Sequence, residues 1–181
     1  MSNTETLQKW AIDPTHTEVQ IKVKHLVIST VTGSFKEFSG DVQSQEDDFD
    51  GAEINFTIDA ASIDTNNPDR DAHLRSDDFF GVEKYPEIKF TDGELKKVSD
   101  GDYKLTGNLT IKEETKEVTL DVDYGGTVKD PWGNNRAGFE IEGKINRKDF
   151  GLTWNTVTEA GGLMVSDDVR LLINVQVVAE G

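Results

Sequence analysis

The stretch Thr17–Ile28 reads TEVQIKVKHLVI, and its side chains alternate in polarity with a period of two. Successive side chains of a β-strand point to opposite faces of the sheet. The apolar face of this strand would carry Val19, Ile21, Val23, His25 and Val27. The opposite face would carry Gln20, Lys22 and Lys24. The pattern predicts a strand with one face in an apolar interior and the other in water.

The same alternation recurs along the rest of the chain, which indicates an all-β protein. The other segments that show it are 38–49, 53–59, 87–95, 103–111, 117–124, 138–145 and 169–179. A closed up-and-down barrel buries one face of such strands and also removes their free edges. We therefore expect a single antiparallel barrel of about eight strands, lipocalin-like and forming one domain over residues 1–181, with a flexible extension at 1–9.

The segment 67–81 interrupts the alternation and predicts one short helix. Asn67 can cap its start, Pro68 suits the first helical position, and Gly81 can end it. Asp71 and Arg75 are four residues apart and can pair on one helix face. We expect this helix to close the barrel like a lid, with the apolar residues of the segment turned inward. These residues are Ala72, Phe79 and Phe80.

The composition restricts the classes of partner. Asp and Glu number 35 against 19 Lys and Arg, which gives a formal charge of −16. Nucleic acids and anionic lipid surfaces need a basic face, so neither is expected as a partner. The chain has no cysteine, which excludes disulfides and thiolate chemistry. No apolar run approaches the roughly 20 residues of a membrane span, and no secretory signal is present. The chain as written is expected to be cytoplasmic, or periplasmic if a leader was removed.

The chain has three histidines, His16, His25 and His73, and no two of them have a spacing typical of metal ligands. We expect no metal and no cofactor. His25 shares the inward face of its strand, where an unpaired imidazole would be costly. Its partner would be either a protein group or the head of a ligand.

Arginines and aspartates cluster in the insert and in NRKDFG at 146–151. They favour a structural network that ties the helix to the barrel end. Its members would be His16, Arg70, Asp71, His73, Arg75 and Asp149. The alternative is recognition of a ligand head group, for which Arg147 is the best candidate because it continues the inward parity of Phe139, Ile141 and Ile145. A hydrolase is not expected, since the G-x-S-x-G motif is missing.

Five segments, in order, resemble the YceI-like family of bacterial proteins. They are WAIDPTHTEVQIKVKHLVISTVTGSF (10–35), DRDAHLRSDDFFGVEKYPEIKF (69–90), GNLTIKEETKEVTLDV (107–122), DPWGNNRAGFEIEGKINRKDFGL (130–152) and VSDDVRLLINV (165–175). The resemblance implies a lipocalin-like barrel around an apolar tunnel that holds a long-chain amphiphile such as a polyisoprenoid, an isoprenoid quinone or a fatty amide. It also implies that the protein is not an enzyme, and that a homodimer is to be expected.

The expected function is therefore non-catalytic binding or carrying of one such lipid. The residues expected at the ligand are Val23, His25, Phe35, Phe38, Phe56, Phe79, Phe80, Phe90, Leu105, Leu120, Phe139, Ile141, Arg147, Trp154 and Met164. The main alternative is a structural or partner-binding barrel whose own side chains fill the interior. Gly107 and Gly143, at inward positions, favour free space instead. A metal-dependent or hydrolytic enzyme is a third, weaker alternative.

Overall fold

The computed structural model describes residues 7–25, 28–45, 48–152 and 165–180, with His25 and Val165 described by their backbone alone. The strands are β1 (Leu7–Ile12), β2 (Glu18–His25), β3 (Ser29–Phe35), β4 (Phe38–Gln45), β5 (Asp48–Asp59), β6 (Ile63–Asp64), β7 (Glu87–Ser99), β8 (Asp102–Ile111), β9 (Glu114–Lys129), β10 (Asn135–Asn146) and β11 (Val165–Ala179). The helices are α1 (Pro68–Arg75) and the 3-10 turns η1 (Pro14–His16), η2 (Ala60–Ser62) and η3 (Arg147–Phe150).

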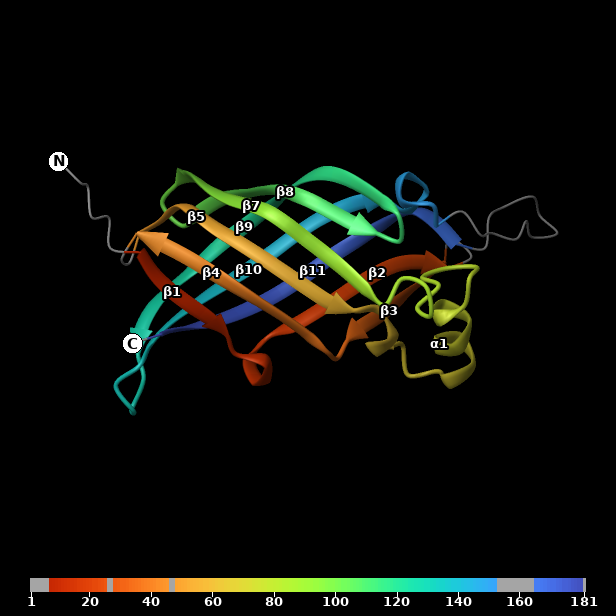
Figure 1. Cartoon of the computed structure of the whole chain (residues 1–181), viewed down its shortest axis with the longest axis horizontal. Helices are drawn as coiled ribbons and strands as arrows, with labels where there is room; N and C mark the ends of the chain where they lie inside the picture. Colours follow the sequence, from red (N-terminus) through yellow and green to blue (C-terminus); the bar gives the residue numbers. More distant parts are fainter. Residues whose placement is uncertain (1–6, 26–27, 46–47, 153–164, 181) are drawn as a thin grey trace.

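The strands close into an antiparallel barrel (Figure 1). Eight of them follow one another around the wall in the order β1, β4, β5, β7, β8, β9, β10 and β11, and pairing of β11 with β1 completes the ring. All these neighbours are antiparallel. The predicted fold, an up-and-down barrel of about eight strands with one short α-helix, is confirmed.

Near the start of the chain, two long strands are each divided into two shorter ones, β1 with β2 and β3 with β4. β1 and β2 both lie along β11, with β1 at Val177–Ala179 and β2 at the preceding residues, and η1 separates them. β3 and β4 likewise form one hairpin arm, which bends at residues 36–37. The sequence pattern predicted only the second strand of each pair, β2 and β4. β1 begins at Leu7, so residues 7–9, which were expected to belong to a flexible extension, are part of a strand.

Alternation placed the buried face correctly in the regular strands. In β8, every second residue from Tyr103 to Ile111 is buried. β11 directs Val169, Leu171, Ile173, Val175 and Val177 into the barrel, as predicted. The missed strand β3 reads STVTGSF, in which Thr, Ser and Gly hide the period of two.

An aromatic cluster fills one end of the barrel. It includes Trp10 of β1, a strand that lies at the end away from α1 in Figure 1. Phe49 is its centre, with ring centroids 5.1 Å from Trp10, 5.4 Å from Tyr124 and 4.9 Å from Phe139. Tyr103 extends the cluster by an edge-to-face contact of 6.1 Å with Tyr124. Trp10 and Phe49 are each only 1% exposed, so this end of the barrel is packed shut.

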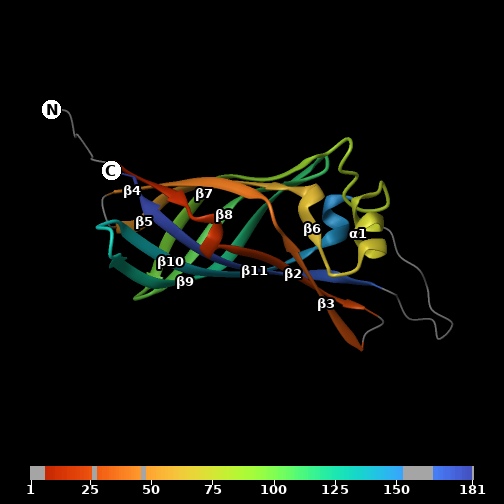
Figure 2. The same ribbon diagram turned by 90° about the horizontal axis from the view of Figure 1, so that it is seen from below.

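The helix α1 and the turn η3 lie at the opposite end of the barrel (Figure 2). The Asn67 side chain caps α1 by accepting a hydrogen bond from the Arg70 amide at 3.1 Å, and Pro68 occupies the first turn, as predicted. The helix ends at Arg75 and not near Gly81, whose φ of +55° belongs to a later turn. In the part of the chain that the structure describes, no helix is long and apolar enough to cross a membrane.

Candidate functional site: an apolar cavity inside the barrel

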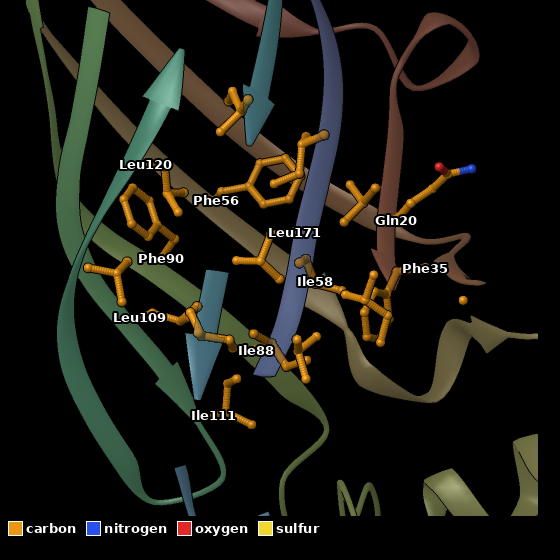
Figure 3. A pocket seen from close by; sticks show the side chains of 18 of the residues that line it. Gln20, Phe35, Phe56, Ile58, Ile88, Phe90, Leu109, Ile111, Leu120 and Leu171 are labelled. Atoms are coloured by element: carbon orange, nitrogen blue, oxygen red, sulfur yellow. The ribbon is translucent and has the colours of Figure 1, made fainter. Parts of the chain in front are cut away.

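A cavity of about 470 Å³ occupies the barrel between the aromatic cluster and α1. This volume lies within the range of about 300–1,000 Å³ that is usual for small-molecule sites. Aliphatic and aromatic side chains from many strands form its wall, and Figure 3 shows Leu171, Phe56, Phe90 and Ile88 converging on it. Gln20, by contrast, points away from these side chains in the same view.

The inward-facing residues do not fill the barrel. Ile54, Phe56 and Ile58 of β5 and Leu171 and Ile173 of β11 line the cavity, yet all of them are only partly buried. Side chains that face each other across a packed core would normally have lost nearly all contact with a water-sized probe. The partial burial therefore reflects free space between opposite walls, and it argues against the self-filled barrel.

The two inward glycines do not themselves provide this space, contrary to expectation. A Cβ at Gly107 would lie 2.5 Å from Cζ of Phe90, and a Cβ at Gly143 would lie 2.1 Å from Cδ2 of Leu120. Each glycine instead accommodates the large side chain of a neighbouring strand. Both Phe90 and Leu120 then present another part of their surface to the cavity.

Phenylalanines cover the cavity at the α1 end. Phe79 and Phe80 are buried and line it, and Phe80 makes an edge-to-face contact with Phe35 of β3 at 5.8 Å. Leu74 of α1 lines it too, whereas Ala72 is exposed, so the inward orientation expected for Ala72 is wrong. The segment that carries these side chains has the position expected of a closing element.

Thr65 is the point at which α1 is fastened to the barrel. The buried Asp71 carboxylate accepts hydrogen bonds from the Thr65 amide at 2.9 Å and from its hydroxyl at 2.5 Å. The Arg70 guanidinium donates to the Thr65 hydroxyl and carbonyl, both at 2.7 Å. Arg70 and Asp71 therefore belong to one network, as predicted. The expected pair between Asp71 and Arg75 is not among the ion pairs of the described residues.

The other residues expected in this network lie apart from it. His73 lines the cavity, contacts the Phe79 ring at 5.1 Å and pairs with Asp78 at 2.9 Å. Asp149 is exposed, and no hydrogen bond or ion pair of its side chain is found among the described residues. Arg75 is partly buried at the end of α1.

His16 belongs to a second polar cluster on the outside of the barrel. Its Nδ1 lies 2.8 Å from Asp13, which also accepts from Arg136 at 2.7 Å. Arg136 in turn donates to Asp130 at 2.7 Å. Hydrogen bonds from Thr15, His16 and Arg136 hold the pKa of Asp13 well below its ordinary value. This cluster ties η1 to the β9–β10 hairpin and has no part in the cavity.

Arg147 is a buried cation at the cavity wall. It is 2% exposed, and it donates to the backbone carbonyls of Ser166 at 2.9 Å and Leu152 at 2.5 Å. Among the described residues, the carboxylate of Asp167 lies 3.9 Å from its guanidinium. Burial lowers the pKa of the Arg147 guanidinium, and the charge of Asp167 opposes this shift. Arg147 lines the cavity, which agrees with its predicted inward parity. Its hydrogen bond to the Ser166 carbonyl holds η3 against the start of β11.

Most residues expected at the ligand line the cavity. Those that do are Val23, Phe35, Phe56, Phe79, Phe80, Phe90, Leu105, Leu120, Phe139, Ile141 and Arg147. Phe38 stacks on Phe56 at 5.7 Å without lining the cavity. The His25 side chain, Trp154 and Met164 lie outside the described part of the chain. Sequence reasoning missed Val31, Gly33 and Leu74, which also line the cavity. Only the parity of the unrecognised strand β3 could have revealed the first two.

Comparison with known proteins agrees with this architecture. The family model for the YceI-like domain matches residues 10–177. The UPF0312 protein of Serratia proteamaculans is 45% identical over 161 residues, which cover 89% of this chain and 80% of that protein. Protein YceI of Salmonella newport is 42% identical over 165 residues, which cover 91% and 83% of the two chains.

Solved structures show the same barrel. The YCEI protein of Campylobacter jejuni is 37% identical with a TM-score of 0.73, over 87% of this chain and 90% of that one. A polyisoprenoid binding domain from Saccharophagus degradans has a TM-score of 0.66 over 94% of this chain and 98% of that one. At 17% identity, this second likeness is one of fold. Since the family match spans residues 10–177 and relatives covered over at least 80% of their length exceed 40% identity, this chain belongs to the YceI-like family.

Proposed function

We propose that this protein binds one long-chain amphiphile, with the apolar tail in the barrel cavity and the polar head near α1, and that it carries or stores this molecule without chemical change. The observation that supports this most is a cavity of about 470 Å³ whose wall is almost entirely aliphatic and aromatic. Water in such a space makes few hydrogen bonds, whereas an alkyl or prenyl chain gains by leaving water.

Burial of the apolar tail is the main source of binding energy in this proposal. Each buried methylene contributes about 0.8 kcal/mol, so a chain of about ten carbons gains several kcal/mol before the entropy of association is subtracted. Apolar contacts of this kind discriminate between ligands by the length and bulk of the tail more than by its chemical groups. We therefore propose a ligand class, namely polyisoprenoids, isoprenoid quinones and fatty amides, and not a single compound.

The two ends of the cavity support an orientation for this ligand. The aromatic cluster around Phe49 closes one end with apolar rings. The polar and charged groups of the lining include Thr65, Arg70, His73 and Arg147, which belong to elements at the α1 end. A molecule with a greasy tail and a polar head would match this asymmetry if its tail pointed toward Phe49.

The proposal can be tested by native mass spectrometry of protein purified without detergent. The same protein is then extracted with organic solvent to identify any bound molecule. We expect a discrete added mass that extracts as a long-chain lipid or isoprenoid. The polyisoprenoid binding domain from Saccharophagus degradans makes polyprenols a natural class to include among the reference compounds. An unliganded mass that stays unchanged after incubation with quinones, polyprenols and fatty amides would contradict the proposal and favour a protein partner.

A further inference from the structure

The charges on the cavity wall differ in balance from those of the whole molecule. Within the described part of the chain, the formally charged residues of the wall are Lys24, Asp69, Arg70 and Arg147. These are three cations against one carboxylate, whereas the whole chain has 35 Asp and Glu against 19 Lys and Arg. Lys24 is exposed, so the two arginines are the cations that the wall shields from water. They belong to α1 and η3, at the end of the barrel where the proposed function places the polar head (Figure 2).

Arg70 is held in a fixed orientation at this wall. Its Nε donates to the Thr65 hydroxyl and its Nη2 donates to the Thr65 carbonyl, both at 2.7 Å. Thr65 is itself buried and bound to Asp71, so the guanidinium is fastened to a rigid part of the structure. A guanidinium has five N–H donors, and these two bonds use only one of its edges. Nη1, on the other edge, has no hydrogen-bond partner among the described residues.

The positive charge of Arg70 has no counterion in the described part of the chain. No ion pair found there includes Arg70, although it stands between Asp69 and Asp71 in the sequence. Asp69 is exposed, and Asp71 reaches Arg70 only through the Thr65 hydroxyl that both of them bind. Arg70 is already partly buried, so a ligand head that covers it would remove more of its water. Removing a charge from water is costly unless an opposite charge replaces the lost hydration.

The other basic groups at this end already have partners. Arg147 donates to two backbone carbonyls and lies 3.9 Å from the Asp167 carboxylate. His73, which also lines the cavity, pairs with Asp78 at 2.9 Å. Of these three side chains, Arg70 is therefore the one whose charge is left for a ligand to neutralise.

We infer that the preferred ligand has an anionic head, either a carboxylate or a phosphate monoester, and that Arg70 binds this head. The inference rests on the proposed function and narrows it to one charge class of long-chain amphiphile. Two oxygens of a carboxylate or phosphate match the parallel N–H groups on one edge of a guanidinium. An uncharged head, such as that of a quinone or an amide, would cover Arg70 without neutralising it. Neutral amphiphiles therefore bind through their tails alone, and more weakly.

Two pairs of compounds with identical tails test the charge of the head. Laurate is compared with lauramide, and farnesyl phosphate with farnesol, by calorimetric titration of the full chain at about pH 8, where the carboxylate is ionised. We expect the charged member of at least one pair to bind at least about tenfold more tightly than the neutral member, and that pair identifies the anion. Equal affinities within both pairs would overturn the inference and leave the proposed function standing. If none of the four compounds binds, both are overturned.

Substitutions on α1 test the role of Arg70. Arg70→Gln should reduce the preference for the charged head to about twofold or less, while lauramide binding changes by no more than about threefold and so reports an intact cavity. Arg70→Lys keeps the charge and should keep most of the preference. Arg75→Gln is the matched control, since it removes the same charge from the same helix and Arg75 does not line the cavity. A preference that survives Arg70→Gln, or that Arg75→Gln abolishes equally, would overturn the assignment of Arg70.

Discussion

Gly107 and Gly143 both stand at inward positions of their strands, but they are expected to respond differently to a single added methyl group. A Cβ at Gly107 would lie 2.9 Å from the backbone Cα of Gly93 as well as close to Phe90, whereas the three atoms nearest to a Cβ at Gly143 all belong to the side chain of Leu120. A side-chain end can rotate toward the cavity, but a backbone atom in a paired strand cannot. Gly107→Ala should lower the free energy of unfolding by about 1–3 kcal/mol and Gly143→Ala by less. Denaturant unfolding measures both, and equal losses would contradict this account.

Asp71 carries a structural role that its neighbour Asp69 does not share. Asp71 is 8% exposed and accepts two hydrogen bonds from Thr65, whereas Asp69 is exposed on the same helix. Asp71→Ala would leave a buried amide and hydroxyl without their acceptor, which costs about 1–3 kcal/mol. Asp69→Ala removes the same charge and should change stability by no more than about 0.5 kcal/mol. Thermal and denaturant unfolding of the two variants would settle the difference, and a tolerant Asp71→Ala would argue against Thr65 as the anchor.

At the scale of elements, the charge of Asp13 is expected to stabilise the attachment of η1 to the barrel. The pKa of Asp13 is lowered in the folded protein, so the stabilisation from its carboxylate is complete above the ordinary Asp pKa of about 3.9 and is lost as the pH falls further. Asp13→Asn should therefore lower the free energy of unfolding by about 1 kcal/mol at pH 7. Urea unfolding of both proteins between pH 7 and pH 2.5 would show the two curves converging below about pH 4. A gap that stays constant over this range would show that the charge is not what matters.

The elements differ in how far the sequence predicts them, and the reason is physical. β8 and β11 alternate apolar and polar residues along most of their length, so strand, face and parity were all predictable. β3 consists mainly of Thr, Ser and Gly, and one of its inward residues is a glycine, so no alternating pattern predicted it. The position of Arg147 followed from strand parity, but its carbonyl partners depend on how η3 meets β11, which no local pattern encodes.

The helix shows the limit of local signals in another way. Asn67 and Pro68 mark its start because capping involves neighbouring residues only. Its end at Arg75 and the exposure of Ala72 depend on the tertiary contacts of Leu74 and Thr65 with the barrel. The aromatic cluster was missed for the same reason, since Trp10, Phe49 and Tyr103 lie on three separate strands.

For the whole molecule, the central question is whether the cavity is needed for lipid uptake. Leu171 and Leu172 are adjacent on β11, and only Leu171 lines the cavity, where its side chain points toward the middle in Figure 3. Leu171→Trp should place an indole in the free space and reduce uptake of a long-chain ligand at least tenfold, since a shortened tail site loses about 0.8 kcal/mol for each methylene excluded. Stability should change little, because the indole fills existing space.

The matched variant Leu172→Trp carries the same substitution on the outer face of the same strand and should bind as the unmodified protein does. Titration with a fluorescent fatty acid, checked by native mass spectrometry, measures uptake by all three proteins. Loss of binding in Leu171→Trp alone would place the ligand inside the barrel. If instead both variants bind normally, the ligand must lie outside the cavity. If both variants lose binding and are also less stable, the loss is explained by disruption of β11 and not by a blocked tail site.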